Sequence, residues 1–577
     1  MEWIDVSGQR RAKLVDGLDP YTVWMLGDGG RFVFGDVDKT SILCPVIIEL
    51  NGISISDFEA GNGLFKSTQT EKLQRWRDSI ALPPLFAAPP PDIAPLVKAL
   101  GFITAVVRWD FFDLLQDPDH VVLRRAITSV TLSRPGQQLP NFDRKLRELS
   151  KIVKLNQSGT EPDTVVVGII DDGIAFAHER FRSDDSHTRI SGLWLQDEKP
   201  SPEAETTPTF FGRGRELSSE DINDLLDQCK YAGRVDEDMV YRRAKVLDFS
   251  KSDHKSLARR GAHGTHVLDI AAGAPSGEEP KWPIVAVQLP SLVTADTSGT
   301  RLTHWAIEGV LYILLESLRI AENRGTKPLP VVINLSYGFT AGPHDGSLPI
   351  ERALRILVAL WEEHVGTKVR IVLPAGNHFL ARMHARLDCP GPAAIELPWR
   401  IHPDDRTPNH VEIWLPPRPF SDPCPVRVSL RAPHQEMSSP AVPETSTACK
   451  LVHDGRKLAE AAYGYVSGRG VITLTVWPTA EVDPPAGPAS SAPAGIWIIR
   501  IENLALQHGE CVNARIQRDD TAYGFPTAGR QSYFDDPSYE RRDCRGHIVL
   551  TDKDDCPVKR AGTLNAIATG DDPRIIV

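Results

Sequence analysis

The sequence predicts an α/β protein: a parallel sheet covered by helices, with an N-terminal α+β region and a β-rich, sandwich-like insertion. From about residue 161 to 379, apolar strands alternate with amphipathic helices, which is the pattern of a parallel sheet covered on both faces. After about residue 380 the helical periods vanish. Strands there alternate at period two between turns rich in proline and glycine, which is typical of an antiparallel sandwich.

Continuous apolar runs predict the strands of the parallel sheet, because such strands are buried on both faces. The runs are TVVVGIID (164–171), PIVAVQL (283–289), LPVVINLSYG (329–338) and KVRIVLPAGN (368–377). Between them, residues 302–322 and 350–364 repeat apolar residues at helical spacing. The first of these helices has an apolar stripe made of Trp305, Ile307, Val310, Leu311, Leu314 and Leu318.

The flanking regions give a division into four segments. Residues 1–160 predict a strand at 44–52 and then a strand, a helix and a strand at 103–108, 109–125 and 127–132. The alternating runs HVEIWLPP, PVRVSLRAP, GVITLTVWP and GIWIIRIENL lie in the β-rich insertion. We therefore predict an N-terminal region (1–160), an α/β domain (161–379), an insertion (380–557) and a return to the α/β domain (558–577).

Charge and composition exclude several classes of function. The net charge is −11 and no lysine–arginine stripe is present, so we expect no nucleic-acid partner. The N-terminus has no apolar core of a signal peptide, and no apolar run is long enough to cross a bilayer, so we expect a cytoplasmic protein without a membrane partner. Eight cysteines form no C-x-x-C pair, so we expect no zinc site. Without a signal peptide we expect buried free thiols, and an oxidised set among the six cysteines after residue 380 is the alternative.

Polar residues follow the predicted strands at one edge of the sheet, where open α/β sheets place their active sites. Asp171 ends the first strand; an aspartate taken alone is more commonly a loop residue that caps a helix. Ser336, Tyr337 and Gly338 end another strand, and their backbone could pair with an extended peptide. Asn377 follows a strand and a glycine, so its amide can face a cleft, although A-G-N alone is typical of a simple turn.

His263 stands at the start of a predicted helix in the stretch RRGAHGTHVLDIAAGA. We expect Val267, Ile270 and Ala271 to form the buried face of that helix, which would fix His263 while its ring faces a cleft. His263 and His266 are three residues apart, a spacing that also fits metal ligation. No H-E-x-x-H pattern accompanies them, so metal is the weaker interpretation.

The order of these motifs resembles that of the subtilisin-like serine peptidases (subtilases). Strand-Asp-x-Gly, H-G-T-H-V, S-x-G and A-G-N follow one another over residues 161–379. The resemblance implies a subtilisin-like sheet and an Asp–His–Ser mechanism. Asp171 would orient His263, His263 would be the general base and then the acid, and Asn377 would donate to the oxyanion. Ser336 to Gly338 would line the binding site of a polypeptide substrate.

Two positions depart from the family pattern. Tyr337 replaces the usual leucine of S-x-G, which puts the shape of that subsite in doubt, and Asp172 replaces the usual serine or threonine. A carboxylate beside Asp171 is expected to perturb its pKa. The family resemblance also allows calcium, but no ligand set can be mapped, and we expect no cofactor. The N-terminal region resembles a subtilase propeptide loosely; a plain interaction domain is an equal alternative.

The nucleophile is the missing part of the resemblance. Gly562-Thr563-Leu564-Asn565-Ala566 nearly spells the family's Gly-Thr-Ser-x-Ala box, with Leu564 in place of serine. In one interpretation this is a ruined box, and leucine cannot act as a nucleophile. In the other it is an earlier segment that leads into a strand at 575–577, and the serine box and the C-terminal part of the catalytic domain would lie beyond these residues. The turn-like run DDPR and the apolar residues after it favour the second interpretation, because the family has a long helix after its serine box.

The sequence therefore predicts a subtilisin-like serine endopeptidase that acts on polypeptides, with Asp171, His263 and Asn377 present and the serine absent from these 577 residues. Such a chain is expected to be inactive. The alternative is a catalytically dead subtilase fold that binds peptides or a protein partner. A nucleotide-binding protein is a poor third, because no phosphate-binding glycine motif is present.

Overall fold

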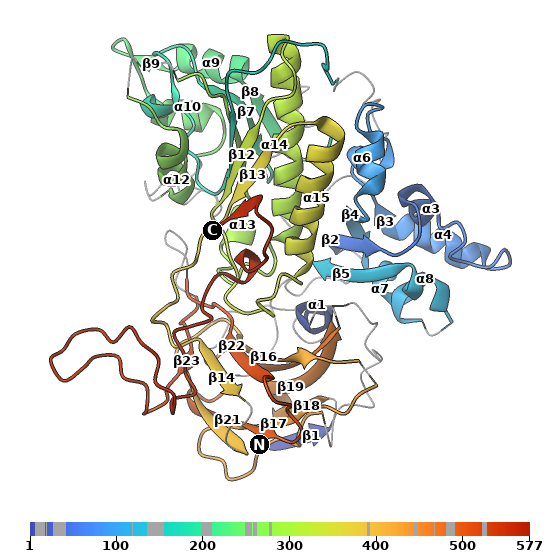
Figure 1. Cartoon of the computed structure of the whole chain (residues 1–577), viewed down its shortest axis with the longest axis vertical. Helices are drawn as coiled ribbons and strands as arrows, with labels where there is room; N and C mark the ends of the chain where they lie inside the picture. Colours follow the sequence, from blue (N-terminus) through green and yellow to red (C-terminus); the bar gives the residue numbers. More distant parts are fainter. Residues whose placement is uncertain are drawn as a thin grey trace.

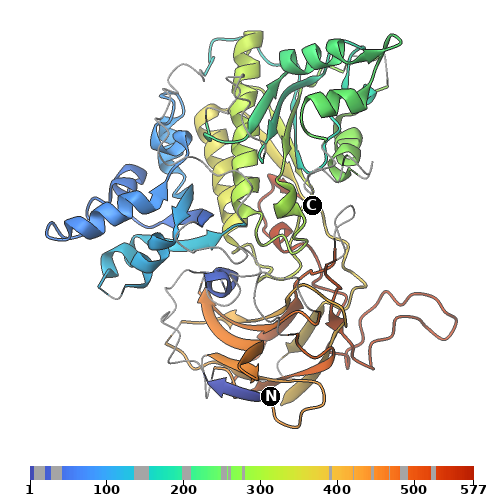
Figure 2. The same ribbon diagram turned by 180° about the vertical axis from the view of Figure 1, so that it is seen from behind.

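The computed structural model describes residues 1–5, 18, 20–26, 42–117, 119–134, 155–197, 210–247, 257, 262–275, 278, 280–388, 393–419, 421–443, 448–466, 468–480, 491–521 and 528–577. It is a mixed α/β protein in which a mostly parallel sheet, at the top of Figure 1, is accompanied by an N-terminal antiparallel sheet to its right and by β-rich antiparallel sheets below it (Figures 1 and 2). The predicted fold class is confirmed at this level.

The central sheet has seven strands in the order β24-β13-β12-β6-β11-β7-β8. Every neighbouring pair is parallel except β7 and β8. The four strands predicted from apolar runs are all present, and β6 lies in the middle. The strands are β6 (Val166–Asp171), β7 (Ile190–Leu195), β8 (Arg215–Ser218), β11 (Ile284–Gln288), β12 (Val331–Leu335), β13 (Val369–Val372) and β24 (Ile575–Ile576).

Helices cover both faces of this sheet. Ile170 of β6 packs toward α14, whereas its neighbour Ile169 belongs to the hydrophobic cluster on the opposite face, as the alternation of a strand requires. The predicted apolar stripe of α14 is fully buried. The helices are α14 (Thr303–Arg324) and α15 (Pro349–Val365) on one face, and α9 (Ser219–Gln228), α10 (Glu237–Arg243) and α12 (His263–Ala272) on the other, with the short α13 (Ser291–Thr294) and η2 (Glu179–Phe181) in connections.

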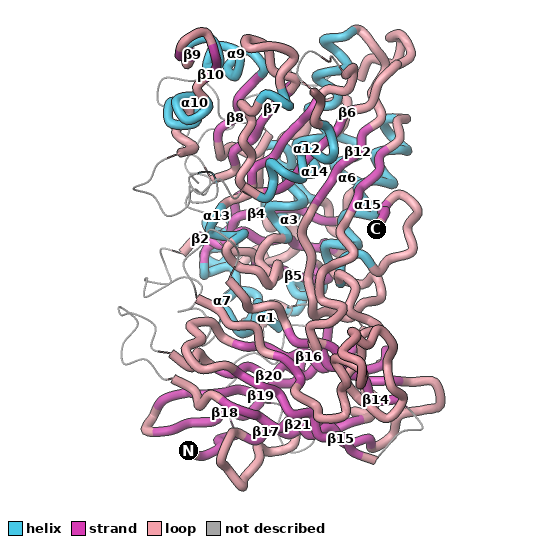
Figure 3. Tube along the Cα trace, turned by 90° about the vertical axis from the view of Figure 1, so that its left-hand side faces the viewer, coloured by secondary structure: helices cyan, strands magenta, loops and turns pink. Residues whose placement is uncertain are grey.

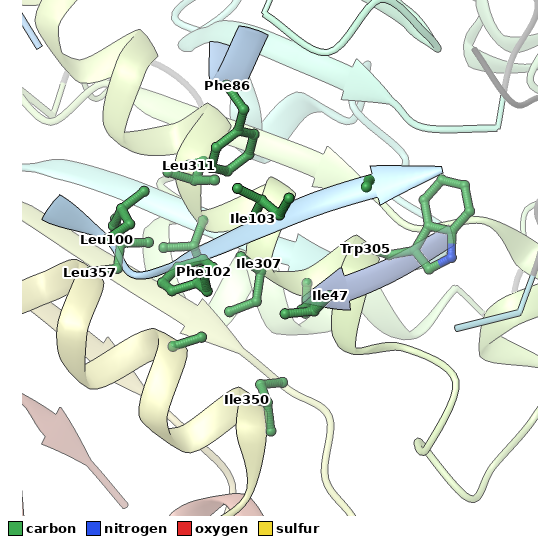
Figure 4. Close-up of a cluster of buried hydrophobic side chains, with 14 of the residues drawn as sticks. Ile47, Phe86, Leu100, Phe102, Ile103, Trp305, Ile307, Leu311, Ile350 and Leu357 are labelled. Atoms are coloured by element: carbon green, nitrogen blue, oxygen red, sulfur yellow. The ribbon is translucent and has the colours of Figure 1, made fainter. Parts of the chain in front are cut away.

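The N-terminal antiparallel sheet, in the order β3-β4-β2-β5, packs against the outer side of α14 and α15. Figure 4 shows Ile47, Phe102 and Ile103 of this sheet lying beside Trp305 and Ile307 of α14. α14 is therefore buried on nearly all sides. The elements are α1 (Pro20–Leu26), β2 (Leu43–Leu50), α3 (Ile55–Ala60), α4 (Thr70–Ser79), β3 (Ile80–Ala81), α5 (Pro84–Ala87), α6 (Ala94–Ala99), β4 (Phe102–Arg108), α7 (Trp109–Gln116), α8 (Val121–Arg125) and β5 (Ile127–Leu132).

One predicted element of this region is wrong in its length. The helix expected over 109–125 is two helices, α7 and α8, and the chain is already extended at Asp117. Position 118 in the sequence is proline, which disfavours a helical conformation of the residue before it.

The β-rich region consists of two antiparallel sheets around a shared core (Figure 3). Their orders are β1-β18-β19-β20-β16-β22-β14 and β17-β21-β15-β23, so the strands form a sandwich. The elements are β1 (Glu2–Asp5), β14 (His384–Asp388), β15 (Ala394–Ile401), β16 (Asn409–Pro417), β17 (Val426–Arg431), β18 (Ala448–His453), β19 (Arg456–Val466), β20 (Arg469–Val476), β21 (Gly495–Asn503), β22 (Cys511–Ile516) and β23 (Tyr533–Phe534); the two-stranded β9 (Lys230–Tyr231) and β10 (Arg234–Val235) lie elsewhere.

The segment boundaries at residues 160, 379 and 557 stay predictions. β1 pairs with β18 and so belongs to the β-rich sheet, and the first hydrophobic cluster contains residues from both sides of residue 160. Among the described residues, no helix is both long and apolar enough to cross a membrane. Seven cysteines are free thiols; Cys44, Cys229, Cys449 and Cys556 are buried, whereas Cys544 is exposed, and Cys389 lies outside the described residues.

A buried ion pair lies between the N-terminal sheet and the central sheet. Arg213 pairs with Glu308 of α14, and their side chains are 2% and 1% exposed. The guanidinium also lies 4.0 Å from the ring centroid of Trp305. Buried ions are tolerated only when they are paired, so this contact depends on both partners.

We expect Glu308→Gln to lower the free energy of unfolding by about 3–5 kcal/mol, because it removes the carboxylate paired with the buried Arg213 and leaves only the charge of Asp197 near a group that cannot lose its proton. Urea denaturation measures the change. Lys281→Met is the matched control, because it removes an ion pair with Asp163 whose side chains are 74% and 72% exposed. Equal stability of Glu308→Gln and the control would contradict the expectation.

Candidate functional site

Asp171 is the last residue of β6, at the carboxyl edge of the central sheet, and its side chain is fully buried. Its Oδ1 accepts hydrogen bonds from the backbone N–H of Asp172 and from Nδ1 of His263, each at 2.8 Å. Its Oδ2 is buried and has no hydrogen-bond partner among the described residues. Burial raises the pKa of Asp171 to about 6, although the contact with His263 opposes this rise.

His263 is the first residue of α12, and its side chain is 58% exposed. The hydrogen bond to Asp171 raises the pKa of His263 above its ordinary value, while partial burial and the charge of Arg518 act in the opposite direction. The ring is therefore anchored through Nδ1 and turned toward solvent. Within the described part of the chain, no hydroxyl group donates to Nε2, so that atom is available to a reacting group.

Two small features of α12 bring His263 to Asp171. The N–H of Gly264 donates to the carbonyl of Asp172 at 2.7 Å, and a Cβ at position 264 would lie 2.3 Å from that oxygen, so only glycine allows this approach. The hydroxyl of Thr265 donates to the carbonyl of Gly173 and accepts from the N–H of Ala175, both at 2.8 Å. The start of the helix is thereby fastened to the turn after β6.

The predicted buried face of α12 is wrong. The buried residues are Gly264, Leu268 and Ala272, whereas Ile270 is 88% exposed, Ala271 is exposed and Val267 is half-buried. The face at positions i, i+4 and i+8 is set by the close contact at Gly264. The apolar pattern of the sequence does not reveal that contact.

Asp172 and Tyr337, the two departures from the subtilase pattern, contact each other. The hydroxyl groups of Tyr337 and Thr294 lie close enough to the Asp172 carboxylate to act on its pKa. Asp172 is 9% exposed, and burial raises its pKa while these two hydroxyl groups oppose the rise. The carboxylate is thus held beside Asp171 by a side chain from the strand end 336–338.

The other predicted site residues lie at the same edge of the sheet. Ser336, Tyr337 and Gly338 follow β12, which is hydrogen-bonded to β6. Asn377 follows β13, the next strand, and is exposed; its side chain makes no hydrogen bond with any described residue, His263 included. The structure therefore joins Asp171 to His263 directly and leaves Asn377 as an unengaged amide two strands away.

Asp171, Asp172 and His263 are the set among the described residues that could hold a metal, since their ligand atoms lie within 4.8 Å of one another. However, Oδ1 of Asp171 is already bonded to His263, and the hydroxyl groups of Tyr337 and Thr294 lie beside the Asp172 carboxylate. A metal would have to displace these contacts. His266 is exposed and is not part of the set, so the structure does not bring together the predicted His263–His266 alternative.

The stretch 562–570 leads into a strand. It contains the short η4 (Ala566–Ala568), and β24 then pairs in parallel with β13 through Ile371 and Ile575. The prediction of a strand after this stretch is confirmed. Leu564 is 49% exposed, whereas Asn565 is 3% exposed and bonds to the ends of β12 and β13. Leu564 is therefore an exposed residue of a connecting segment.

Comparisons with known proteins give a distant likeness. No family model matches the chain, and no curated protein matches its sequence. Among solved structures, the chain is similar to the structure of the Clostridium perfringens CspB protease, with a TM-score of 0.41 and 18% identity. The match covers 61% of this chain and 63% of that one, less than two thirds of its length. A likeness at this level carries no argument about function, which therefore rests on geometry.

The sequence reasoning missed three contributors to the site. Thr265 and Asn565 lie within the motifs H-G-T-H-V and 562–566, but their roles come from hydrogen bonds to segments distant in sequence, which the motifs do not reveal. Arg518, after β22, comes close enough to oppose the rise in the pKa of His263 and to add to the lowering of the pKa of His378 by burial. The sequence did draw attention to Asp172 and Tyr337, because both positions depart from the family pattern.

We expect Asp171→Asn to lower the pKa of His263, because the variant removes the carboxylate while partial burial and Arg518 still disfavour the imidazolium. In the wild type, a raised pKa means that His263 stays protonated to a higher pH than a free histidine. NMR titration of ¹³C-labelled histidine rings measures the midpoint.

Asp184→Asn is the matched control for this titration, because Asp184 and His187 form another Asp–His pair at 2.9 Å, exposed on the surface. It should leave the midpoint of His263 unchanged. A midpoint of His263 that does not fall in Asp171→Asn would show that the hydrogen bond does not control its protonation.

Proposed function

We propose that the chain has a subtilisin-like fold and the acid–base half of a subtilisin-like serine endopeptidase. The observation that carries the proposal is the Asp171–His263 pair: a buried carboxylate at the end of the central parallel strand, 2.8 Å from the imidazole of a histidine that opens a helix. This arrangement suits a general base that is oriented by a carboxylate.

In this proposal each residue has a defined role. Nε2 of His263 takes a proton from an attacking hydroxyl group and later donates it to the leaving amine. Asp171 holds the ring through Nδ1 and stabilises the imidazolium, which agrees with the raised pKa of His263. Asn377 offers an exposed amide that is free to donate to an oxyanion, and Ser336 to Gly338 offer an edge that can pair with an extended polypeptide.

The nucleophile is not among these functional groups. Leu564 has no nucleophilic atom, and no described serine donates to Nε2 of His263. We therefore infer that these 577 residues bind polypeptides at the strand edge but do not form an acyl-enzyme.

The second candidate function is a peptide- or protein-binding module with a catalytically dead subtilase fold. Tyr337 favours it, because its hydroxyl group lies beside Asp172, next to the Asp–His pair, at a position where the family pattern has a leucine. The coding sequence past codon 577 discriminates between the two functions: a Gly-Thr-Ser-x-Ala box favours the peptidase, and a natural stop in related genes favours the binding module.

We expect a fluorophosphonate probe to leave the 577-residue chain unlabelled, because the probe reacts with a serine that a histidine activates. Gel fluorescence measures labelling, with His263→Ala as the matched control and active subtilisin as the positive control. Labelling that disappears in His263→Ala would show that the chain contains its own nucleophile, and the inference would be wrong.

A further inference from the structure

Asn565 lies between the ends of two strands that carry predicted site residues. We propose that Asn565 is a positioning residue that fixes the peptide-binding edge, residues 336–338, relative to the loop 374–377 that bears Asn377. The proposal rests on the proposed function, because only that function makes residues 336–338 a peptide-binding edge. Its physical basis is a set of hydrogen bonds from one buried side chain.

The side-chain amide of Asn565 uses all of its hydrogen-bonding capacity. Oδ1 accepts from the N–H groups of Phe339 at 3.0 Å and Ile567 at 3.2 Å. Nδ2 donates to the carbonyl oxygens of Tyr337 at 3.2 Å and Pro374 at 3.1 Å. An amide has two donors and two acceptor sites, so no other common side chain of this size satisfies these four groups together.

The backbone of the same segment adds two further bonds. The N–H of Asn565 donates to the carbonyl of Ala375, and that of Ala566 donates to the carbonyl of Phe339, both at 2.8 Å. The register of β12 with β13 covers residues 331–334 and 369–372 and stops there. Beyond that point, Asn565 bridges the two chains that continue toward the site.

This bridge also decides which backbone groups remain available for a substrate. Tyr337 and Phe339 are two residues apart. The carbonyl of Tyr337 and the N–H of Phe339 both hydrogen-bond to the side chain of Asn565. Gly338 lies between them, and its own N–H and carbonyl make no hydrogen bond with Asn565. Among the described residues, nothing hydrogen-bonds to the backbone of Gly338, which suits pairing with a peptide.

Gly338 is itself required by this arrangement. A Cβ at position 338 would lie 2.3 Å from Cγ of Asn565 and 2.4 Å from its Nδ2 and Oδ1. The glycine of S-x-G and the asparagine of the later segment therefore fit together. The segment is also anchored away from the site, where the N–H and hydroxyl of Thr569 donate to Glu351 of α15 at 3.2 and 3.1 Å.

The test compares Asn565→Ala and Asn565→Asp with the control Asn409→Ala. Asn409 is a fully buried asparagine of β16 whose Nδ2 donates to Asp405 at 2.9 Å, so its loss should destabilise the chain away from the edge. The probe is fluorescein-labelled, reduced and carboxymethylated α-lactalbumin, which stays unfolded, and its binding is followed by fluorescence anisotropy below the melting temperature of every variant.

We expect both Asn565 variants to bind the probe about 10-fold or more weakly than the wild type, because a mispositioned edge loses its backbone pairing. Asn565→Asp should be as weak as Asn565→Ala, since a carboxylate oxygen would face the carbonyls of Tyr337 and Pro374. Asn409→Ala should lower the melting temperature but leave binding unchanged. Hydrogen exchange of peptides that span 336–341 and 374–379 should be faster only in the Asn565 variants.

Wild-type binding and wild-type exchange in Asn565→Ala would overturn the positioning role. If the wild type does not bind the probe, the proposed peptide edge fails, but the exchange measurement still decides the positioning role. Faster exchange in the Asn565 variants alone supports it, and equal exchange in Asn565→Ala and Asn409→Ala overturns it.

Discussion

The site depends on one desolvated carboxylate. Asp171 is fully buried at the end of β6, and its charge is supported only by His263 and the N–H of Asp172 among the described residues. A carboxylate in such a place favours its neutral form, which is why its pKa rises to about 6. The glycine at 264 and the hydroxyl of Thr265 bring the histidine close enough to oppose this cost. The contacts of Gly264 and Thr265 at the start of α12 thus hold His263 next to Asp171.

Much of the fold could be predicted because its strands and central helix have strong apolar patterns. β6, β11, β12 and β13 are short runs of β-branched residues, and the apolar stripe of α14 repeats at helical spacing. The buried face of α12 could not be predicted in this way. A glycine sets it through a contact with Asp172, and a hydropathy pattern treats glycine as uninformative.

The site was predictable where a residue follows a buried strand or opens a helix, as Asp171 and His263 do. It was not predictable where the contact joins distant segments. Asn565 bonds to Phe339 across 226 residues of sequence, and Arg518 comes from the β-rich region. Such partners have no shared periodicity, so only the folded chain reveals them. Asp172 and Tyr337 were partly predictable. Each departs from the family pattern in the sequence, but only the structure shows that they lie beside each other.

The energetics of the Asp–His pair bear on the choice between catalysis and binding alone. A peptide-binding edge needs extended backbone and a fixed position, which residues 336–338 and Asn565 can supply without any buried charge. Asp171 has a raised pKa, and its Oδ2 has no partner among the described residues, so ionised Asp171 costs the folded state stability at neutral pH. Peptide binding alone does not explain why the chain keeps a buried carboxylate that lowers its stability. Proton transfer through His263 does, because a base held by a carboxylate is what such chemistry requires. The buried pair therefore supports the proposed acid–base role over the proposal of binding alone, even though these residues offer it no nucleophile.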